Sequence, residues 1–155
     1  MNQLIGIISD THGLLRPEAV SALSGCDLIL HAGDIGKPDV LESLKKIAPV
    51  YAIRGNNDTD KWAEKIPEDR TVKIDSISIY MIHDVKEINP AAWRRTPDVV
   101  VSGHSHKPQI QEREGILYIN PGSAGPRRFK LPVSIATLKL NGSNVKATLT
   151  ELKIG

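Results

Sequence analysis

The chain has 155 residues, of which 40% are hydrophobic and 25% charged, a composition typical of one globular domain. A net charge of +2 and an aromatic content of 4% argue against nucleic acid or a membrane surface as the main partner. No apolar run approaches the roughly 20 residues of a membrane span, and the single Cys26 excludes an intramolecular disulfide. We therefore expect one domain over residues 1–155, in a reducing, cytoplasmic compartment.

The first half of the chain alternates short apolar runs with segments that favour helices. Apolar runs at 4–8, 27–30 and 50–53 predict three buried strands. Helices are expected from Pro17 to Leu23 and from Pro38 onward, because proline is favoured in the first turn of a helix. This alternation predicts a parallel βαβαβ unit with right-handed crossovers.

The second half is predicted to consist mainly of antiparallel hairpins. Three hairpins are expected, over residues 71–82, 110–119 and 133–152. A short helix or loop at 87–95 and a buried strand at 98–101 separate the first hairpin from the second. A parallel half followed by a half rich in hairpins predicts two sheets packed face to face, with helices outside.

Side chains that commonly bind metals follow the ends of these strands. Asp10 and His12 come directly after the first strand, and both would point the same way if the chain stays extended there. In open parallel sheets, sites form beyond the carboxyl ends of the strands, so later residues should converge on these two. The complete set is Asp10, His12, Asp34, Asn56, His83, His104 and His106.

The chemistry of this set predicts a metal centre. It combines histidine, carboxylate and amide without thiolate, which suits Mn²⁺, Fe or Zn²⁺, and it holds four of the five histidines. Seven groups exceed the needs of one tetrahedral ion and suit two ions that share a carboxylate. Singly, Asp10 or Asp34 could cap a helix and Asn56 could form a turn, but their joint occurrence at strand ends favours metal ligands.

The order of the motifs adds a resemblance to a known family. The motifs Asp10-x-His12, Gly33-Asp34, Gly55-Asn56-Asn57-Asp58, His83 and Gly103-His104-x-His106 resemble those of the calcineurin-like metallophosphoesterase superfamily, and within it the compact YfcE-type phosphodiesterases. The resemblance implies an α/β fold, a four-layer α/β/β/α sandwich of two mixed sheets. It also implies one ion on Asp10, His12 and His106, a second on Asn56, His83 and His104, and Asp34 as the bridge.

The same resemblance implies an activity and its cofactors. A metal-bridging hydroxide would attack a small or nucleotide-like phosphodiester in line. Two divalent ions are expected, with Mn²⁺ favoured and Zn²⁺, Fe or Ni²⁺ as alternatives. The expected partner is a small-molecule phosphodiester, and a homodimer is left open.

Two positions depart from the family pattern. Asn57 stands where many relatives have a histidine that serves as general acid or oxygen clamp, and an amide cannot supply a full proton. Asp84 follows His83 where relatives often have glycine, which calls the local backbone conformation into question. Asn57 and Asp34 are the expected catalytic residues, and Asn57 and Arg127 the expected substrate contacts, although Arg127 fits a solvated face equally well.

Residues beside the predicted ligands have simpler interpretations. His31 lies inside a buried strand and is expected to be a hydrogen-bonded supporting histidine, and Asp58 to be a turn or supporting acid. Two other functions are considered for the chain. One is a non-catalytic scaffold, like the retromer sorting subunit of the same fold, which lacks part of the catalytic set that this chain keeps. The other is a phosphomonoesterase, against which Asn57 and the short chain argue.

Overall fold

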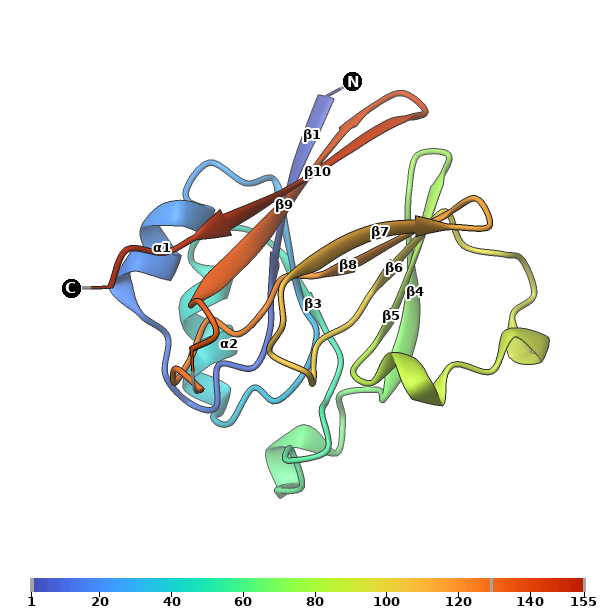
Figure 1. Cartoon of the computed structure of the whole chain (residues 1–155). Coiled ribbons are helices and arrows are strands. Elements are labelled where there is room, and N and C mark those ends of the chain that lie inside the picture. The colour runs from blue at the N-terminus through green and yellow to red at the C-terminus, as the bar shows by residue number, and fades with distance from the viewer. Residues whose placement is uncertain (1, 129, 155) are drawn as a thin grey trace.

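The computed structural model describes residues 2–128 and 130–154 and contains two five-stranded sheets. Its α-helices and strands are β1 (Asn2–Ile8), α1 (Pro17–Leu23), β2 (Leu28–His31), α2 (Pro38–Lys45), β3 (Val50–Ala52), β4 (Asp69–Ile74), β5 (Ile77–Ile82), β6 (Val99–Val101), β7 (Gln109–Arg113), β8 (Ile116–Asn120), β9 (Ser134–Asn141) and β10 (Asn144–Glu151). Three single-turn 3₁₀ helices are η1 (Lys61–Ala63), η2 (Val85–Glu87) and η3 (Pro90–Ala92). The two sheets lie side by side in Figure 1, with α1 and α2 on the far side of the first.

The first sheet has the strand order β10-β9-β1-β2-β3. Strands β1, β2 and β3 are parallel, which confirms the predicted βαβαβ unit, and β9 and β10 extend the sheet in antiparallel pairing. Ile8 pairs with His31, and His31 with Ala52, so the three parallel strands end at one edge. The turns that follow them therefore start close together.

The second sheet has the order β4-β5-β6-β8-β7 and is also mixed. Strands β5, β6 and β8 are parallel, and β4 and β7 pair with β5 and β8 as the predicted hairpins. The backbone N–H of Gly103, after β6, donates to the carbonyl of His83, after β5, at 2.9 Å. This bond joins the carboxyl ends of two strands of the second sheet.

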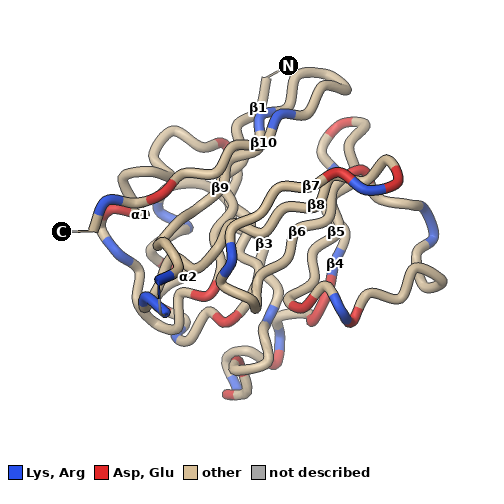
Figure 2. Tube along the Cα trace, in the orientation of Figure 1, with Lys and Arg blue, Asp and Glu red and all other residues tan. Residues whose placement is uncertain are grey.

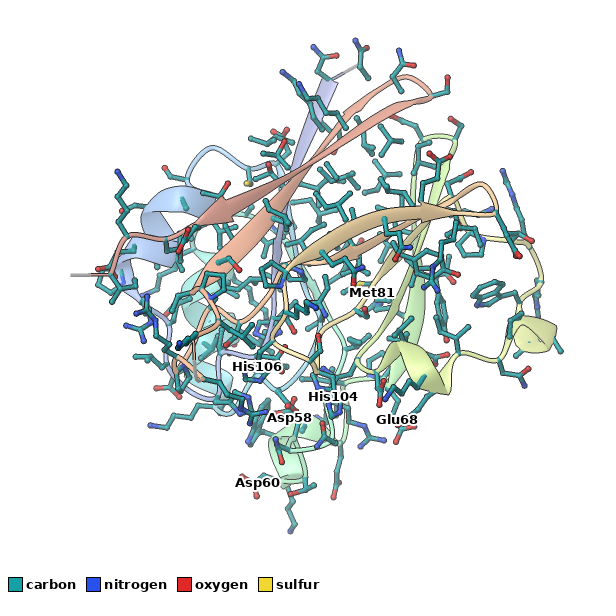
Figure 3. The ribbon with its side chains drawn as sticks, in the orientation of Figure 1. Asp58, Asp60, Glu68, Met81, His104 and His106 are labelled. Carbon is teal, nitrogen blue, oxygen red and sulfur yellow. The ribbon has the colours of Figure 1, made fainter. Side chains whose placement is uncertain are left out.

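Strands of the first sheet contribute alternating side chains to two separate hydrophobic cores. Ile5 and Ile7 point between the sheets and pack in one core with Met81, which Figure 3 labels. Ile8 and Ile29 point the other way and pack against the helices, in a core that includes Leu23 of α1 and Leu44 of α2. Period-2 alternation thus lets each strand of the first sheet serve both layers.

The outer face of the second sheet carries the thinnest layer. A small cluster that includes Tyr80 and Val100, with Trp93 packed against it, covers this face together with η2 and η3. Within the expected helix or loop at 87–95, residues 90–92 form the single turn η3, while η2 ends at Glu87. The predicted four-layer α/β/β/α class is confirmed, with its last layer reduced to these turns. Across the described residues, no helix combines the length and apolar character needed to cross a bilayer.

Candidate metal centre

The predicted ligands lie in turns whose backbone conformation is unusual. Asp10, His12, Asp34, His104 and His106 all have positive φ, from 47° to 73°. The extended chain that would let strand alternation point Asp10 and His12 the same way is therefore absent, although both side chains do face one site. Left-handed backbone is unfavourable for residues with a Cβ, and such strain gathers at functional sites. The turns, rather than strand alternation, aim these side chains.

Asp10 is held by two hydrogen bonds to one of its carboxylate oxygens. The Ser9 hydroxyl donates to Oδ2 at 2.7 Å, and the backbone N–H of His104 donates to the same oxygen at 3.1 Å. Oδ1 is buried and has no hydrogen-bond partner. It lies 3.8 Å from Nε2 of His12, 3.7 Å from Nε2 of His83 and 3.4 Å from Nε2 of His106. Three imidazole nitrogens around one unbonded carboxylate oxygen are an arrangement that a cation would stabilise.

Asp34 lies between histidines of the two predicted ligand sets. Its Oδ2 is 3.7 Å from Nε2 of His12 and 3.2 Å from Nε2 of His83. Asn57 holds both carboxylate oxygens, since its backbone N–H donates to Oδ1 at 3.0 Å and its side-chain amide to Oδ2 at 3.1 Å. Burial opposes ionisation, but His83 and the Asn57 backbone hold the pKa of Asp34 well below its usual range. Asp34 is therefore ionised and placed where a bridging ligand is expected.

His83 is oriented by the backbone directly after β2. Its Nδ1 lies 2.7 Å from the carbonyl oxygen of Ala32, so this nitrogen carries a proton and donates. Burial alone would lower the pKa of His83, but contact with Asp34 and the charge of Asp10 raise it to about 9. A cation that binds Nε2 must displace a proton from this imidazole.

His104 and Asn56 are placed less tightly than the other predicted ligands. The His104 ring centroid is 5.3 Å from that of His83, and its side chain is 47% exposed. Asn56 is exposed. Both line a cleft of about 480 Å³ together with His83. Figure 3 shows His104 and His106 in the lower central part of the view, above Asp58.

The donor set fits divalent cations. Two triads of the described residues have ligand atoms within 4.8 Å of one another: Asp10, His12 and His106, and Asp10, Asp34 and His83. The first triad is the set implied for one ion, and the second includes the implied bridge. Buried polar atoms without hydrogen-bond partners in these triads are Oδ1 of Asp10, Nε2 of His12, Nε2 of His83 and Nδ1 of His106. A buried donor or acceptor without a partner lowers the stability of the fold. Several such atoms at one place therefore indicate a binding site for a ligand such as a metal ion.

His31 supports the centre from within β2, as predicted. The backbone N–H of Gly33 donates to Nδ1 at 3.1 Å, so the proton sits on Nε2, which lies 3.0 Å from the Thr11 hydroxyl. Thr11 in turn donates to the carbonyl of Ile35 at 2.8 Å. Burial lowers the pKa of His31 to about 4, which keeps this ring neutral. The network fixes the turns that carry Asp10 and Asp34.

Asp58 also supports the centre, by joining two turns. Its carboxylate accepts backbone N–H groups of Ile35 and Gly36, after β2, and of Gly55, after β3. Gly55 must be glycine, because a Cβ there would collide with the Asp34 carboxylate. The predicted role of Asp58 as a supporting acid is confirmed.

Asp84 is a charged residue of the site to which sequence reasoning gave no role. Its φ of −112° is ordinary, so the missing glycine leaves the backbone unstrained. Its Oδ1 accepts the backbone N–H of Lys86 at 3.0 Å, and its Oδ2 lies 3.7 Å from Nε2 of His104. The adjacency of Asp84 to His83 was the available signal. Arg127 lies exposed between β8 and β9 and does not line the cleft, so its substrate contact stays a prediction.

Comparisons with known proteins agree with this geometry. The profile of the calcineurin-like phosphoesterase superfamily domain matches residues 3–143. A probable metallophosphoesterase of Methanothermobacter thermautotrophicus is 37% identical over 94% of this chain and 91% of its own length. A solved archaeal phosphodiesterase has 25% identity and a TM-score of 0.77, covering 95% of this chain and 99% of that one. Vacuolar Protein Sorting 29 from Cryptosporidium parvum has 21% identity and a TM-score of 0.76, with 99% of both chains covered, which shows a shared fold.

Proposed function

The chain belongs to the calcineurin-like phosphoesterase superfamily, and from this premise we propose that it is a phosphodiesterase with two divalent metal ions. The observation that carries the proposal is the buried, unpartnered Oδ1 of Asp10 with Nε2 of His12, His83 and His106 around it. Asp10, His12 and His106 would hold one ion, and Asn56, His83 and His104 the other, with Asp34 between them. Mn²⁺ is the favoured metal, and Zn²⁺, Fe and Ni²⁺ are alternatives.

The metal ions would supply a lowered pKa for water and neutralisation of charge on the phosphate oxygens. Neighbouring residues of the chain orient the ligand side chains through hydrogen bonds. Ser9 fixes Asp10 and Asn57 fixes Asp34, so both carboxylates present defined oxygens to the cations. The carbonyl of Ala32 fixes the tautomer of His83 with Nε2 toward the centre.

Asn57 has a second role in the proposal. Its amide carries two N–H donors, and one of them donates to Asp34. The other could donate to the departing oxygen of the substrate, although it cannot transfer a proton. The enzyme should therefore prefer diesters whose leaving groups are stable as anions. Arg127 is proposed as a contact to the far side of the substrate.

Hydrolysis of bis(4-nitrophenyl) phosphate tests this function. The protein is stripped with chelator, reconstituted with Mn²⁺, and assayed on this diester and on 4-nitrophenyl phosphate. We expect diester activity that depends on metal and falls by at least about 100-fold in Asp34→Asn or His106→Ala. Asp39→Asn, a change in an exposed carboxylate of α2, is the matched control. Two equivalents of bound metal are expected by elemental analysis.

The competing functions give different results in the same assay. A phosphomonoesterase would prefer 4-nitrophenyl phosphate. A non-catalytic role is the second candidate, because Vacuolar Protein Sorting 29 shares the fold over 99% of both chains. Such a protein would hydrolyse neither compound, even with two equivalents of metal bound.

A further inference from the structure

An open cleft adjoins one side of the metal centre. It has a volume of about 480 Å³, within the range of small-molecule sites. Asn56, His83 and His104 form the part of its lining that belongs to the centre. Nε2 of His83 is buried without a hydrogen-bond partner, and His83 itself is only 5% exposed. Because these three side chains line the cleft, a molecule in it would contact proposed metal ligands.

The rest of the lining carries a strong negative charge. Its charged members outside the centre are four carboxylates, of Glu68, Asp69, Asp84 and Glu87, against one guanidinium, of Arg54. Arg54 is paired with Glu68 at 3.2 Å, and His104 lies 3.7 Å from Asp84, so Asp69, Asp84 and Glu87 have no lysine or arginine partner in the lining. The chain as a whole has a net charge of +2. Figure 2 shows the acidic segments gathered at the lower end of β4 and beside β5.

The carboxylates of this lining do not converge on one point. Among residues 2–128 and 130–154, the groups of ligand atoms within 4.8 Å of one another are confined to the metal centre. Asp69 instead accepts the Tyr80 hydroxyl at 2.6 Å. A compact metal ion needs converging oxygens, whereas a broad organic cation is satisfied by charge spread over a wider rim.

The cleft also offers apolar and aromatic surface. Tyr80, Ile82 and Ala92 line it beside the acids. Trp93 packs edge-on against Tyr80, with ring centroids 5.6 Å apart, and holds that ring in place. Methyl or methylene groups attached to a cationic nitrogen find contact on such a surface, and an aromatic ring adds attraction for the charge.

A second cleft has the opposite charge. It has a volume of about 290 Å³ and shares Asp84 and His104 with the first. Lys86, Lys107 and Arg113 line it. The acidic cleft is therefore a local feature of one side of the centre, and His104 marks the boundary between the two.

We propose that the acidic cleft binds an organic ammonium group carried by one ester substituent of the phosphodiester. This rests on the proposed function, since the phosphate must lie at the metal centre while the ammonium group enters the cleft. Asp69, Asp84 and Glu87 select for the positive charge, and Tyr80 and Ile82 contact the carbon atoms around the nitrogen.

A pair of isosteric substrates tests the selection for charge. The first is 4-nitrophenyl phosphorylcholine, and the second is 4-nitrophenyl 3,3-dimethylbutyl phosphate, which replaces the ammonium nitrogen by carbon. We expect kcat/KM to favour the diester that carries the ammonium group by about fivefold at low salt, the upper end of the effect of an exposed ion pair. The double variant Asp69→Asn/Glu87→Gln should bring this ratio close to one. Glu42→Gln, which removes an exposed carboxylate of α2, should leave it unchanged.

Direct binding separates this inference from the proposed hydrolysis. Choline chloride is titrated into the protein and followed by the amide and indole resonances in ¹⁵N NMR spectra. We expect shifts confined to residues that line the cleft and to the indole of Trp93, which packs against Tyr80, and their loss in the double variant. If neither diester is hydrolysed, the proposed function fails, and the choline shifts alone decide the inference. A substrate ratio near one in the parent, a ratio unchanged in the double variant, or no choline shift at Trp93 would overturn it.

Discussion

Asp58 joins two turns of the metal centre, so its removal should lower the free energy of unfolding. The residue is 3% exposed. Its Oδ2 accepts the N–H of Ile35 at 3.0 Å and of Gly55 at 2.9 Å, and its Oδ1 accepts the N–H of Gly36 at 3.0 Å. The three donors lie in the turns after β2 and β3, close in sequence to Asp34 and Asn56.

The number of bonds lost sets the expected magnitudes. A hydrogen bond to a charged group contributes about 1.5–3 kcal/mol, and buried donors left without partners add a desolvation cost. Asp58→Ala removes all three bonds, so we expect a loss of about 4–6 kcal/mol, comparable to the whole stability of a marginal domain. Asp58→Asn keeps one oxygen for Ile35 and Gly55 and loses the bond to Gly36 and the charge, so about 2–3 kcal/mol is expected.

Urea unfolding in the presence of chelator measures these losses without the contribution of bound metal. Asp39→Asn controls for the removal of an exposed carboxylate. Calorimetric titration of Mn²⁺ into Asp58→Asn should also show weaker binding, because Asp34 is less firmly placed. Equal losses in the asparagine and alanine variants, or a loss below about 1 kcal/mol in Asp58→Ala, would refute the reasoning from three separate bonds.

Four further changes have defined outcomes. Because His31 binds a proton near its ordinary pKa of 6.5 when unfolded and only at about 4 when folded, stability should fall as the pH drops from 6.5 to 4. The fall amounts to about 3 kcal/mol and should be missing in the urea titration of His31→Leu. Gly103→Ala should weaken metal binding in calorimetry, since the added Cβ would lie 2.6 Å from Oδ2 of Asp10. Excess Mn²⁺ added after chelation should raise Tm by mass action and release protons, largely from His83, and an unchanged Tm would contradict the metal centre. Asn57→His should raise turnover most on diesters with poor leaving groups, and equal dependence on leaving-group pKa in both proteins would show that Asn57 does not control this step.

The elements of the fold could be predicted because they depend on local patterns. The helix expected from Pro17 to Leu23 has those bounds in the structure, and the strand expected at 77–82 is β5. Proline at a first helical turn and continuous apolar runs are properties of adjacent residues. The pairing of two sheets also followed from the change from alternating helices and strands to hairpins.

The aim of the ligand side chains could not be predicted in the same way. Asp10 and His12 adopt left-handed backbone in a turn bonded to distant chain, with Asp10 N–H donating to Gly33 and His12 N–H to Asp34. Side-chain alternation along the first strand gives no information about these partners, because they lie in another part of the chain. The direction of both side chains is thus a property of two adjacent turns together.

The sequence by itself determined which chemical groups the centre can use, because carboxylate, imidazole and amide side chains followed five separate apolar runs. Only the tertiary structure decided which hydrogen-bond and charge partners each of these groups has. It turned one oxygen of Asp10 toward three imidazoles and gave the other to Ser9. It also brought Glu68 and Asp69, at the start of β4, to the same cleft as Asp84 and Glu87 after β5. The physical reason is that electrostatic interactions and hydrogen bonds depend on distance in space and not on separation along the chain. Antiparallel pairing of β4 with β5 makes these residues neighbours.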